Sequence, residues 1–152
     1  MKINYNLDEQ QFWEACFDGN IEEVQKLVQN QQLNINWQNY LGATPFYIAC
    51  EKGHIEIVKL LLNDQRIDVN NAKYDDTTPF YIACEEGHIE VAKLLLNDKR
   101  ISIRKKTNKG KTAFDIAKRN NHSEVMKLIK EEDTGISYET INSATINKIE
   151  IK

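Results

Sequence analysis

Residues 45–64 read PFYIACEKGHIEIVKLLLND, and residues 79–98 repeat them almost unchanged as PFYIACEEGHIEVAKLLLND, 34 positions later. The same period continues outside this stretch, in Phe12, Phe46, Phe80 and Phe114 and in Ala15, Ala49, Ala83 and Ala117. Self-similarity at a period of 20–50 residues is typical of a repeat protein, in which each unit buries its apolar side against its neighbours. The pattern therefore predicts one stacked domain built from about four copies of a single unit.

One unit can be read from its helix signals. Thr44-Pro45 predicts a helix start, because the first turn tolerates the missing N–H of proline. Gly53 predicts its end, since glycine readily adopts the left-handed conformation that closes many helices. A second helix is predicted from about His54 to Leu62, where apolar residues recur at helical spacing. The alternating residues 67–70 then predict an extended arm, so a unit is two antiparallel helices and a projecting hairpin.

These segments carry a family resemblance. TPFYIA at 44–49 followed by GHIEIVKLLL at 53–62 resembles the ankyrin repeat, and residues 78–96 resemble it again. The resemblance extends over roughly residues 9–132 when weaker end copies are included. It implies an all-α solenoid of stacked helix-turn-helix units with short β-hairpin loops. We expect a repeat domain over 1–132, made of a capping repeat 7–36, repeats 37–70 and 71–104, and a capping repeat 105–132, followed by a tail over 133–152.

The chain departs from the family pattern in three places. Tyr47 and Tyr81 stand where the family has histidine, so the hydrogen bonds of that histidine are not carried over. The repeat is one residue longer than usual, and we expect Asn63 or Asp64 to take the left-handed position that glycine has in the family. Asp76 replaces the turn glycine that Gly42 and Gly110 retain, which leads us to expect that the hairpin tips project differently from the standard form of the family.

The two ends of the array have polar outer surfaces, as terminal repeats need for solubility. Apolar positions of the inner copies become polar in the end copies, at Glu23, Lys26, Lys118, Ser123 and Lys130. Beyond residue 133 the repeat stops. For the tail we weigh a flexible segment, a strand that covers the end of the stack, and the start of a further region, and we favour partial disorder.

Bulk composition narrows the class of protein. A formal net charge of −3 and a pI near 5.7 argue against a dedicated nucleic-acid binder. The N-terminus lacks the apolar run of a secretory signal, and no stretch is apolar enough to span a bilayer. We expect a soluble, monomeric, intracellular protein, in the cytoplasm, with no membrane partner.

No catalytic constellation is visible. Equivalent positions of stacked repeats lie about 8–10 Å apart. That distance is too long for a disulfide among Cys16, Cys50 and Cys84, or for one metal ion shared by His54, His88 and His122. We interpret the cysteines as buried reduced thiols and the histidines as helix-start residues with local hydrogen bonds. No phosphate-binding loop or nucleophile motif occurs. The expectation is a noncatalytic protein without cofactor or metal.

The family resemblance places a set of residues on the concave face formed by hairpins and first helices, which in this family usually binds proteins. They are Tyr40, Leu41, Ala43, Glu51 and Lys52, then Tyr74, Asp75, Thr77, Glu85 and Glu86, then Asn108, Lys109, Lys111, Arg119 and Asn120. Exposed aromatic side chains on a rigid tip are typical interface anchors. Tyr40 and Tyr74 therefore suggest partner contacts, although they could instead pack against their own hairpins.

A second hypothesis comes from residues 99–111, KRISIRKKTNKGK, which contain no acidic residue. The basic patch comprises Lys99, Arg100, Arg104, Lys105 and Lys106, next to Lys109 and Lys111. It could recognise a phosphorylated or otherwise anionic ligand. Nucleic acid is disfavoured because no aromatic residue interrupts the basic run to stack on bases. The patch could equally be a solvated loop.

Two asparagines occupy a notable hairpin position. The resemblance implies that Asn36 and Asn70 stand where ankyrin repeats can be hydroxylated. The stronger interpretation is that their side chains brace the turn through backbone hydrogen bonds. Arg104 replaces the asparagine in the next copy.

Overall fold

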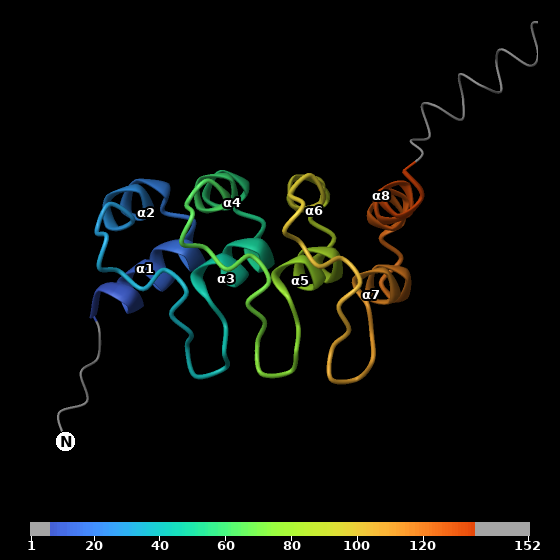
Figure 1. Ribbon diagram of the computed structural model, residues 1–152, viewed down its shortest axis with the longest axis horizontal. Coiled ribbons are helices and arrows are strands. Elements are labelled where there is room, and N and C mark those ends of the chain that lie inside the picture. Colours follow the sequence, from blue (N-terminus) through green and yellow to red (C-terminus); the bar gives the residue numbers. More distant parts are fainter. Residues whose placement is uncertain (1–6, 136–152) are drawn as a thin grey trace, which may run out of the picture.

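The computed structural model describes residues 7–135 and arranges them as two parallel rows of helices with three loops projecting from one row (Figure 1). The inner row consists of α1 (Leu7–Asp18), α3 (Pro45–Lys52), α5 (Pro79–Glu86) and α7 (Ala113–Arg119). The outer row consists of α2 (Ile21–Leu27), α4 (Ile55–Leu62), α6 (Ile89–Leu96) and α8 (Ser123–Thr134). Neighbouring helices pack against each other within each row. The all-helical repeat solenoid expected from the sequence is confirmed.

The helix boundaries follow the predicted signals. Thr44 caps α3 by accepting a 3.0 Å hydrogen bond from the Tyr47 N–H, and Pro45 is the first helical residue. Gly53 ends the helix with a left-handed φ of 71°. In the last copy the equivalent position is Asn121, which takes the same conformation with φ of 60°. The fourth unit therefore keeps its helix turn without glycine.

One expectation about the loops is wrong. Asn63 has a right-handed φ of −81°, and within residues 7–135 only Asp76 and Asn121 among non-glycine residues have a positive φ, so neither Asn63 nor Asp64 is left-handed. Asp76, with φ of 63°, adopts the conformation of the glycines it replaces, because a short polar side chain tolerates it. Its hairpin therefore turns like the other two.

The three hairpins share one hydrogen-bond pattern. They span 39–43, 73–77 and 107–111, and in each the first residue donates its N–H to the carbonyl of the fifth, at 2.9–3.1 Å. The fourth residue, which is Gly42, Asp76 or Gly110, donates back to the first at 2.8–2.9 Å. No β-strand is formed within residues 7–135. The expected β-hairpins are thus tight hydrogen-bonded loops without strand pairing, and adjacent loops are joined by one bond, such as Asn108 N–H to Asp75 O at 3.0 Å.

The core runs continuously along the stack. Phe12, Phe46 and Phe80 are at most 1% exposed. Each phenylalanine of the series is followed three residues later by an alanine, and these four alanines are at most 5% exposed. Phe114 is only half-buried, with the Lys130 ammonium 5.4 Å from its ring centre, because no inner-row helix follows α7 within residues 7–135. The aromatic series therefore marks both the shared interior and the end of the array.

The three cysteines are buried, unpaired and stacked inside this core. Burial raises the pKa of the Cys50 thiol well above its ordinary value, and it acts in the same direction on Cys16 and Cys84. The interpretation of these residues as buried thiols is confirmed.

Histidines link each repeat to the preceding one. The Nε2–H groups of His54, His88 and His122 donate to the carbonyls of Phe17, Glu51 and Glu85, at 3.0, 2.8 and 2.8 Å. Each ring also lies against the helix-ending glycine of that preceding repeat. The expectation of local hydrogen bonds was wrong, because none of the three side chains caps its own helix.

Polar side chains of the loops form a second link between repeats. Asn36 donates to Arg66 O at 2.7 Å and accepts from the Asp68 N–H at 2.8 Å, and Asn70 makes the same pair of bonds to Arg100 and Ser102. The bracing role expected for these asparagines is confirmed, and the braced turn belongs to the next repeat.

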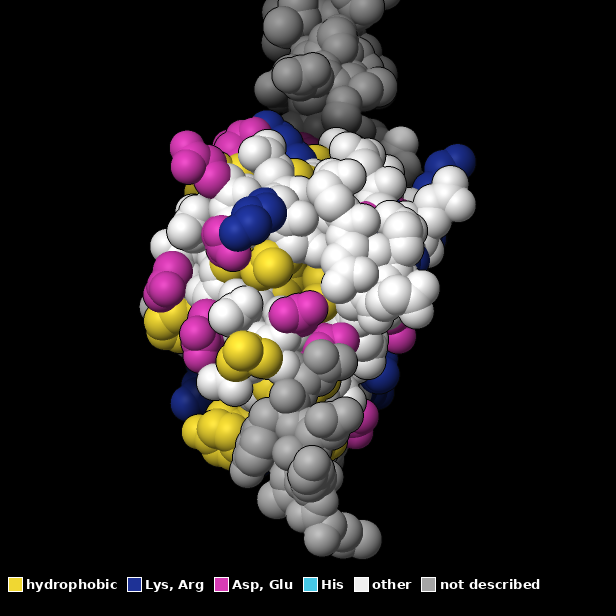
Figure 2. Space-filling view, turned by 90° about the vertical axis from the view of Figure 1, so that its left-hand side faces the viewer, with side chains coloured by type: hydrophobic (Ala, Val, Ile, Leu, Met, Phe, Trp, Pro, Cys, Tyr) yellow, Lys and Arg dark blue, Asp and Glu magenta, His cyan; other side chains and the backbone are white. Residues whose placement is uncertain are grey.

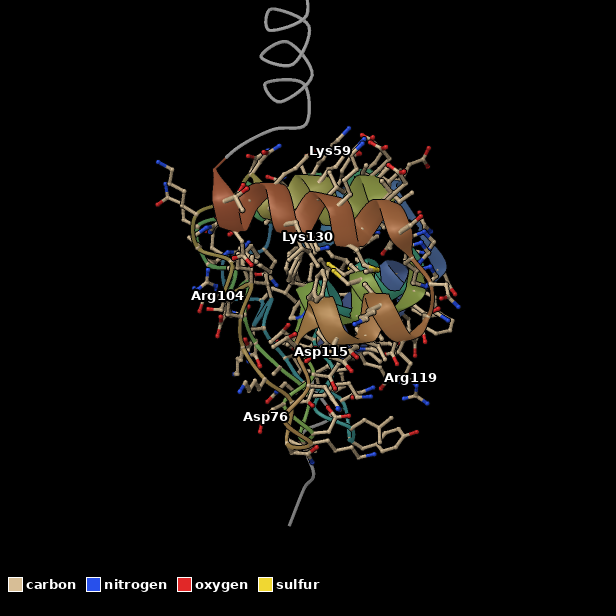
Figure 3. All side chains as sticks on the ribbon, turned by 90° about the vertical axis from the view of Figure 1, so that its right-hand side faces the viewer. Lys59, Asp76, Arg104, Asp115, Arg119 and Lys130 are labelled. Carbon is tan, nitrogen blue, oxygen red and sulfur yellow. The ribbon has the colours of Figure 1, made fainter. Side chains whose placement is uncertain are left out.

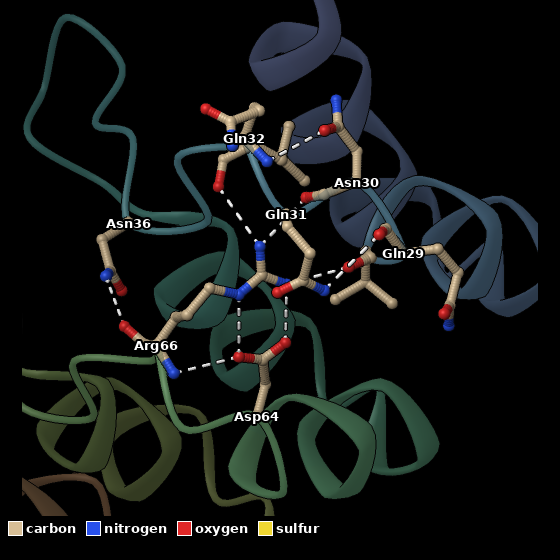
Figure 4. Close-up of polar contacts among 9 residues, drawn as sticks. Gln29, Asn30, Gln31, Gln32, Asn36, Asp64 and Arg66 are labelled. Carbon is tan, nitrogen blue, oxygen red and sulfur yellow. Dashed lines mark hydrogen bonds and ion pairs between the residues drawn. The ribbon is translucent and has the colours of Figure 1, made fainter.

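Arg66 completes this junction (Figure 4). Its guanidinium pairs with Asp64 at 2.7 Å and donates to the carbonyls of Val28 and Asn30 at 2.8 and 3.0 Å. These carbonyls follow the end of α2, where they have no partner inside the helix. Arg66, which belongs to the second repeat, therefore caps the C-terminal end of α2 in the first repeat.

Candidate protein-binding surface

The candidate surface is named here the hairpin face. It consists of the three hairpins together with the exposed C-terminal ends of α1, α3, α5 and α7, beneath which the hairpins project (Figure 1). The histidine bonds described above hold the carbonyls of Phe17, Glu51 and Glu85 at these helix ends. The side chains of those three residues therefore start from fixed backbone positions.

The tips of the first two hairpins carry large exposed side chains. Tyr40 is 85% exposed, Tyr74 72% and Leu41 47%. The Tyr74 ring lies beside the neighbouring hairpin, since a Cβ added to Gly42 would be 2.9 Å from its Cδ1 atom. This contact orients Tyr74 and still leaves most of its surface accessible, as an interface anchor requires.

Ala43 and Thr77 differ from the other residues placed on this surface by the sequence. They are only 4% and 7% exposed. The Ala43 carbonyl accepts a 3.1 Å hydrogen bond from the Trp13 indole N–H, and the Thr77 N–H donates to Asp75 at 3.0 Å. Both residues support the hairpins, and their side chains offer little area to a partner.

A hollow of about 580 Å³ lies between the second and third hairpins and the helices α5 and α7. Its charged lining is provided by the carboxylates of Asp75, Glu85 and Asp115 and by the cationic groups of Lys109, Lys111 and Arg119. Thr77 and Asn108 contribute as well. Seven residues that the sequence analysis placed on the binding face thus meet in one hollow.

The pKa values of two carboxylates in the hollow, Glu85 and Asp75, are shifted in opposite directions. Burial, followed by the neighbouring Glu86 carboxylate, raises the pKa of Glu85 above its ordinary value. For Asp75 burial acts in the same direction, but hydrogen bonding from Thr77 together with the charge of Lys73 outweighs it and holds the pKa of that carboxyl below its ordinary value. A cation placed beside Glu85 would therefore oppose the raised pKa and favour the ionised form of this carboxyl.

The sequence analysis missed an aromatic pair at the N-terminal end of this surface. Trp13 and Phe17 stack with their ring centres 5.5 Å apart, and the Lys52 ammonium lies 4.6 Å from the Phe17 ring centre. Phe17 is 41% exposed. Figure 2 looks onto this end and shows hydrophobic side chains reaching the surface among acidic ones. The repeat alignment could have placed Phe17 on this surface, because it precedes Glu51 by one period.

The basic segment does not form one patch. Arg100 pairs with Asp98 at 2.6 Å and donates to Leu62 O at 2.9 Å, and Arg104 pairs with Asp133 at 2.9 Å. Viewed along the stack, Arg104 and Arg119 lie on opposite sides of the molecule (Figure 3). Lys109 and Lys111 line the hollow.

The remaining lysines of the segment are spread out. Lys99 borders a separate shallow groove between outer helices, and Lys105 and Lys106 are exposed on the loop before the third hairpin. Lys99 thus lies apart from Lys109 and Lys111, whereas Lys106 is near enough to the hollow for its charge to act on the Asp115 carboxyl, and a single anion-binding site over 99–111 stays a prediction.

A search for reactive clusters gives a negative result for the part of the chain that the structure describes. No group of three or more His, Cys, Asp or Glu side chains between residues 7 and 135 could hold a metal ion. None of the helices in the same range is both long enough and apolar enough to cross a membrane.

Comparison with known proteins agrees with the architecture. The family model described as ankyrin repeats (3 copies) matches residues 12–107 and again residues 64–142. No curated protein matches the chain. The two family matches together cover most of the sequence, including all of the helical stack from Phe12 onward. The chain therefore belongs to the ankyrin repeat family.

Proposed function

We propose that this protein is a noncatalytic scaffold that binds another protein through the hairpin face. Ankyrin repeats generally mediate protein–protein interaction. The observation that carries the proposal is the exposure of Tyr40 and Tyr74 on loops that are braced by hydrogen bonds. A rigid exposed aromatic gains contact area on binding and loses little conformational entropy, which is why such residues concentrate binding energy.

The surroundings of the tyrosines support this role. The partly apolar tips stand next to a hollow with charged walls, which is the combination of apolar anchor and polar rim found in protein interfaces. The domain assignment belongs to the same proposal: capping repeat 7–36, repeats 37–70 and 71–104, and capping repeat 105–132 act as one binding unit. Helix α8 ends at Thr134, two residues beyond that boundary.

The test is a quantitative capture of partners from a lysate of the source cell with wild-type protein and with a Tyr40→Ala/Tyr74→Ala variant. Recovery of the specific partner should fall at least tenfold, since removing interface anchors costs about 2 kcal/mol or more. The control is Glu22→Ala/Gln25→Ala, two exposed positions on the outer helix α2, which should recover the partner like wild type.

Both variants should unfold at the wild-type temperature, because all four side chains are exposed. Equal recovery by the tyrosine variant and wild type would remove the hairpin tips from the binding site.

A further inference from the structure

The exposed end of each inner helix carries a different chemistry at the same repeat position. Phe17, Glu51, Glu85 and Arg119 succeed one another at intervals of one period, from α1 to α7. The order along the stack is apolar, acidic, acidic and basic. Three of these positions are the helix ends whose carbonyls bind the histidine of the next repeat, so their spacing is set by the stacking.

The hairpins repeat this order at a separate position. Leu41, Asp75 and Lys109 occupy the third residue of successive hairpins. They are again apolar, acidic and basic in the same direction along the stack. Both positions change from apolar through acidic to basic along the stack and so give the hairpin face an apolar, an acidic and a basic zone. The change to acidic falls one repeat later at the hairpins, because Leu41 and Glu51 belong to the same unit.

The apolar zone is preorganised. The Trp13 indole is tied to the first hairpin through Ala43 O, and it stacks on Phe17 at a 20° angle between the ring planes. Tyr40 and Leu41 extend the zone to the hairpin tip and remain exposed. An apolar side chain of a partner would contact aromatic rings that are already held in place, so binding would lose less conformational entropy.

In the described part of the chain the acidic and basic zones are not joined by close ion pairs, although the charges of Arg119 and Lys73 act on Glu85 against the rise in its pKa. Within residues 7–135 no ion pair of 4 Å or less involves Asp75, Glu85, Lys109, Lys111 or Arg119. Glu85 is half-buried in the wall of the hollow. A half-buried carboxylate that makes no close ion pair has already lost part of its hydration in the free protein, so less desolvation opposes pairing with a partner's cation.

We propose that the hairpin face binds an extended segment of its partner protein in which an apolar, a basic and an acidic side chain follow one another at intervals of about three residues. The interval follows from the stack, since neighbouring repeats lie about 8–10 Å apart and an extended chain advances about 3.3–3.6 Å per residue. The apolar group contacts Tyr40 and Leu41 of the first hairpin, one repeat before Asp75. The basic group contacts Glu85 and Asp75, and the acidic group contacts Lys109, Lys111 and Arg119. This inference rests on the proposed protein-binding function and specifies the partner.

Selection from a random library of displayed 12-residue peptides on the full-length chain tests it. Enriched peptides should share the order apolar, basic, acidic at roughly three-residue intervals, in one chain direction. A second selection on Glu85→Lys protein should replace the central basic residue of the motif by an acidic one. Failure to enrich any peptide, or enrichment without this order, overturns the inference.

Charge-reversal variants test the same inference by measured affinity. A synthetic peptide from the wild-type selection should bind Glu85→Lys and Arg119→Glu protein at least tenfold more weakly, by fluorescence anisotropy. It should bind the controls Glu22→Lys and Lys99→Glu, which reverse exposed charges outside the hairpin face, like wild type. Unchanged binding to Glu85→Lys contradicts the inference.

The two proposals fail in different ways. If charge reversal has no effect while Tyr40→Ala/Tyr74→Ala still loses its partner from lysate, the partner chemistry is wrong and the binding function stands. If the tyrosine variant also behaves like wild type, the hairpin face is not the binding surface.

Discussion

At the scale of single residues, the contact between glycine and histidine explains much of the recurring motif. Gly53 has a φ of +71°, and a Cβ placed on it would lie 2.8 Å from two atoms of the His88 ring. Glycine is needed there both for the backbone conformation and for the space. Gly19 and Gly87 meet His54 and His122 in the same way. In each pair the glycine ends the first helix of its repeat, and the histidine of the next repeat packs against that glycine.

Gly53→Ala should therefore lower the free energy of unfolding by about 2–3 kcal/mol, because backbone strain and a clash with the His88 ring add up. The matched control is Gly110→Ala, which has a similar φ of +73° and nothing within 4 Å of the added Cβ. It should cost only about 1 kcal/mol. Urea denaturation of both variants measures the difference, and equal losses would show that the ring contact is unimportant.

At the scale of the elements, arginines of the loops hold the outer helices in register. Arg66 reaches two carbonyls after α2 at 3.0 Å or less, whereas the equivalent Arg100 reaches only Leu62 O, at 2.9 Å. Hydrogen bonding to Arg66, opposed by partial burial, holds the pKa of Asp64 below its ordinary value, so the carboxylate stays charged beside the guanidinium. The first junction is thus more extensively bonded than the second.

Arg66→Ala should destabilise the protein by about 1–3 kcal/mol, the range for charge-assisted hydrogen bonds, and more than Arg100→Ala does, because Arg66 is only partly exposed and donates to more carbonyls. Amide hydrogen exchange should then show faster opening of α2 in the Arg66 variant, while α6 keeps its protection. A larger effect of Arg100→Ala would contradict this assignment.

At the scale of the whole molecule, stability depends on contact between neighbouring units. Each repeat contacts only its neighbouring repeats. The array therefore unfolds in a single cooperative transition only when every interface between repeats is well packed. Ala83 is fully buried in α5, at the middle of the inner row, where the backbones approach closely. Its position couples the first half of the stack to the second.

Ala83→Glu should abolish the single cooperative melting transition, because it places an unpaired charge in a space sized for a methyl group. Circular dichroism during heating measures this. Glu86→Ala, at an exposed position of the same helix, should change the stability by no more than about 0.5 kcal/mol. A wild-type melting curve for Ala83→Glu would refute the stacked interior.

The candidate surface was predictable in part. Tyr40, Leu41 and Tyr74 could be placed on it from the repeat alignment and are exposed, while Ala43 and Thr77 were aligned equally well and are buried. Alignment locates a backbone position, but exposure depends on neighbours such as the Trp13 side chain beside Ala43. Similarly, the charges of residues 99–111 are contiguous in sequence, yet Arg100 pairs with Asp98 in its own loop and Arg104 pairs with Asp133 of α8.

The sequence by itself determined the period, the helix boundaries and the all-helical stack, because hydrophobic spacing and cap residues act within a single unit. Only the tertiary structure decided which unit each polar side chain serves. The partners of His88, Asn36 and Arg66 are backbone groups 30–38 residues away, and no local pattern specifies them. Stacking brings equivalent positions within one helix spacing of each other, and this proximity creates both the links between repeats and the ordered zones of the hairpin face.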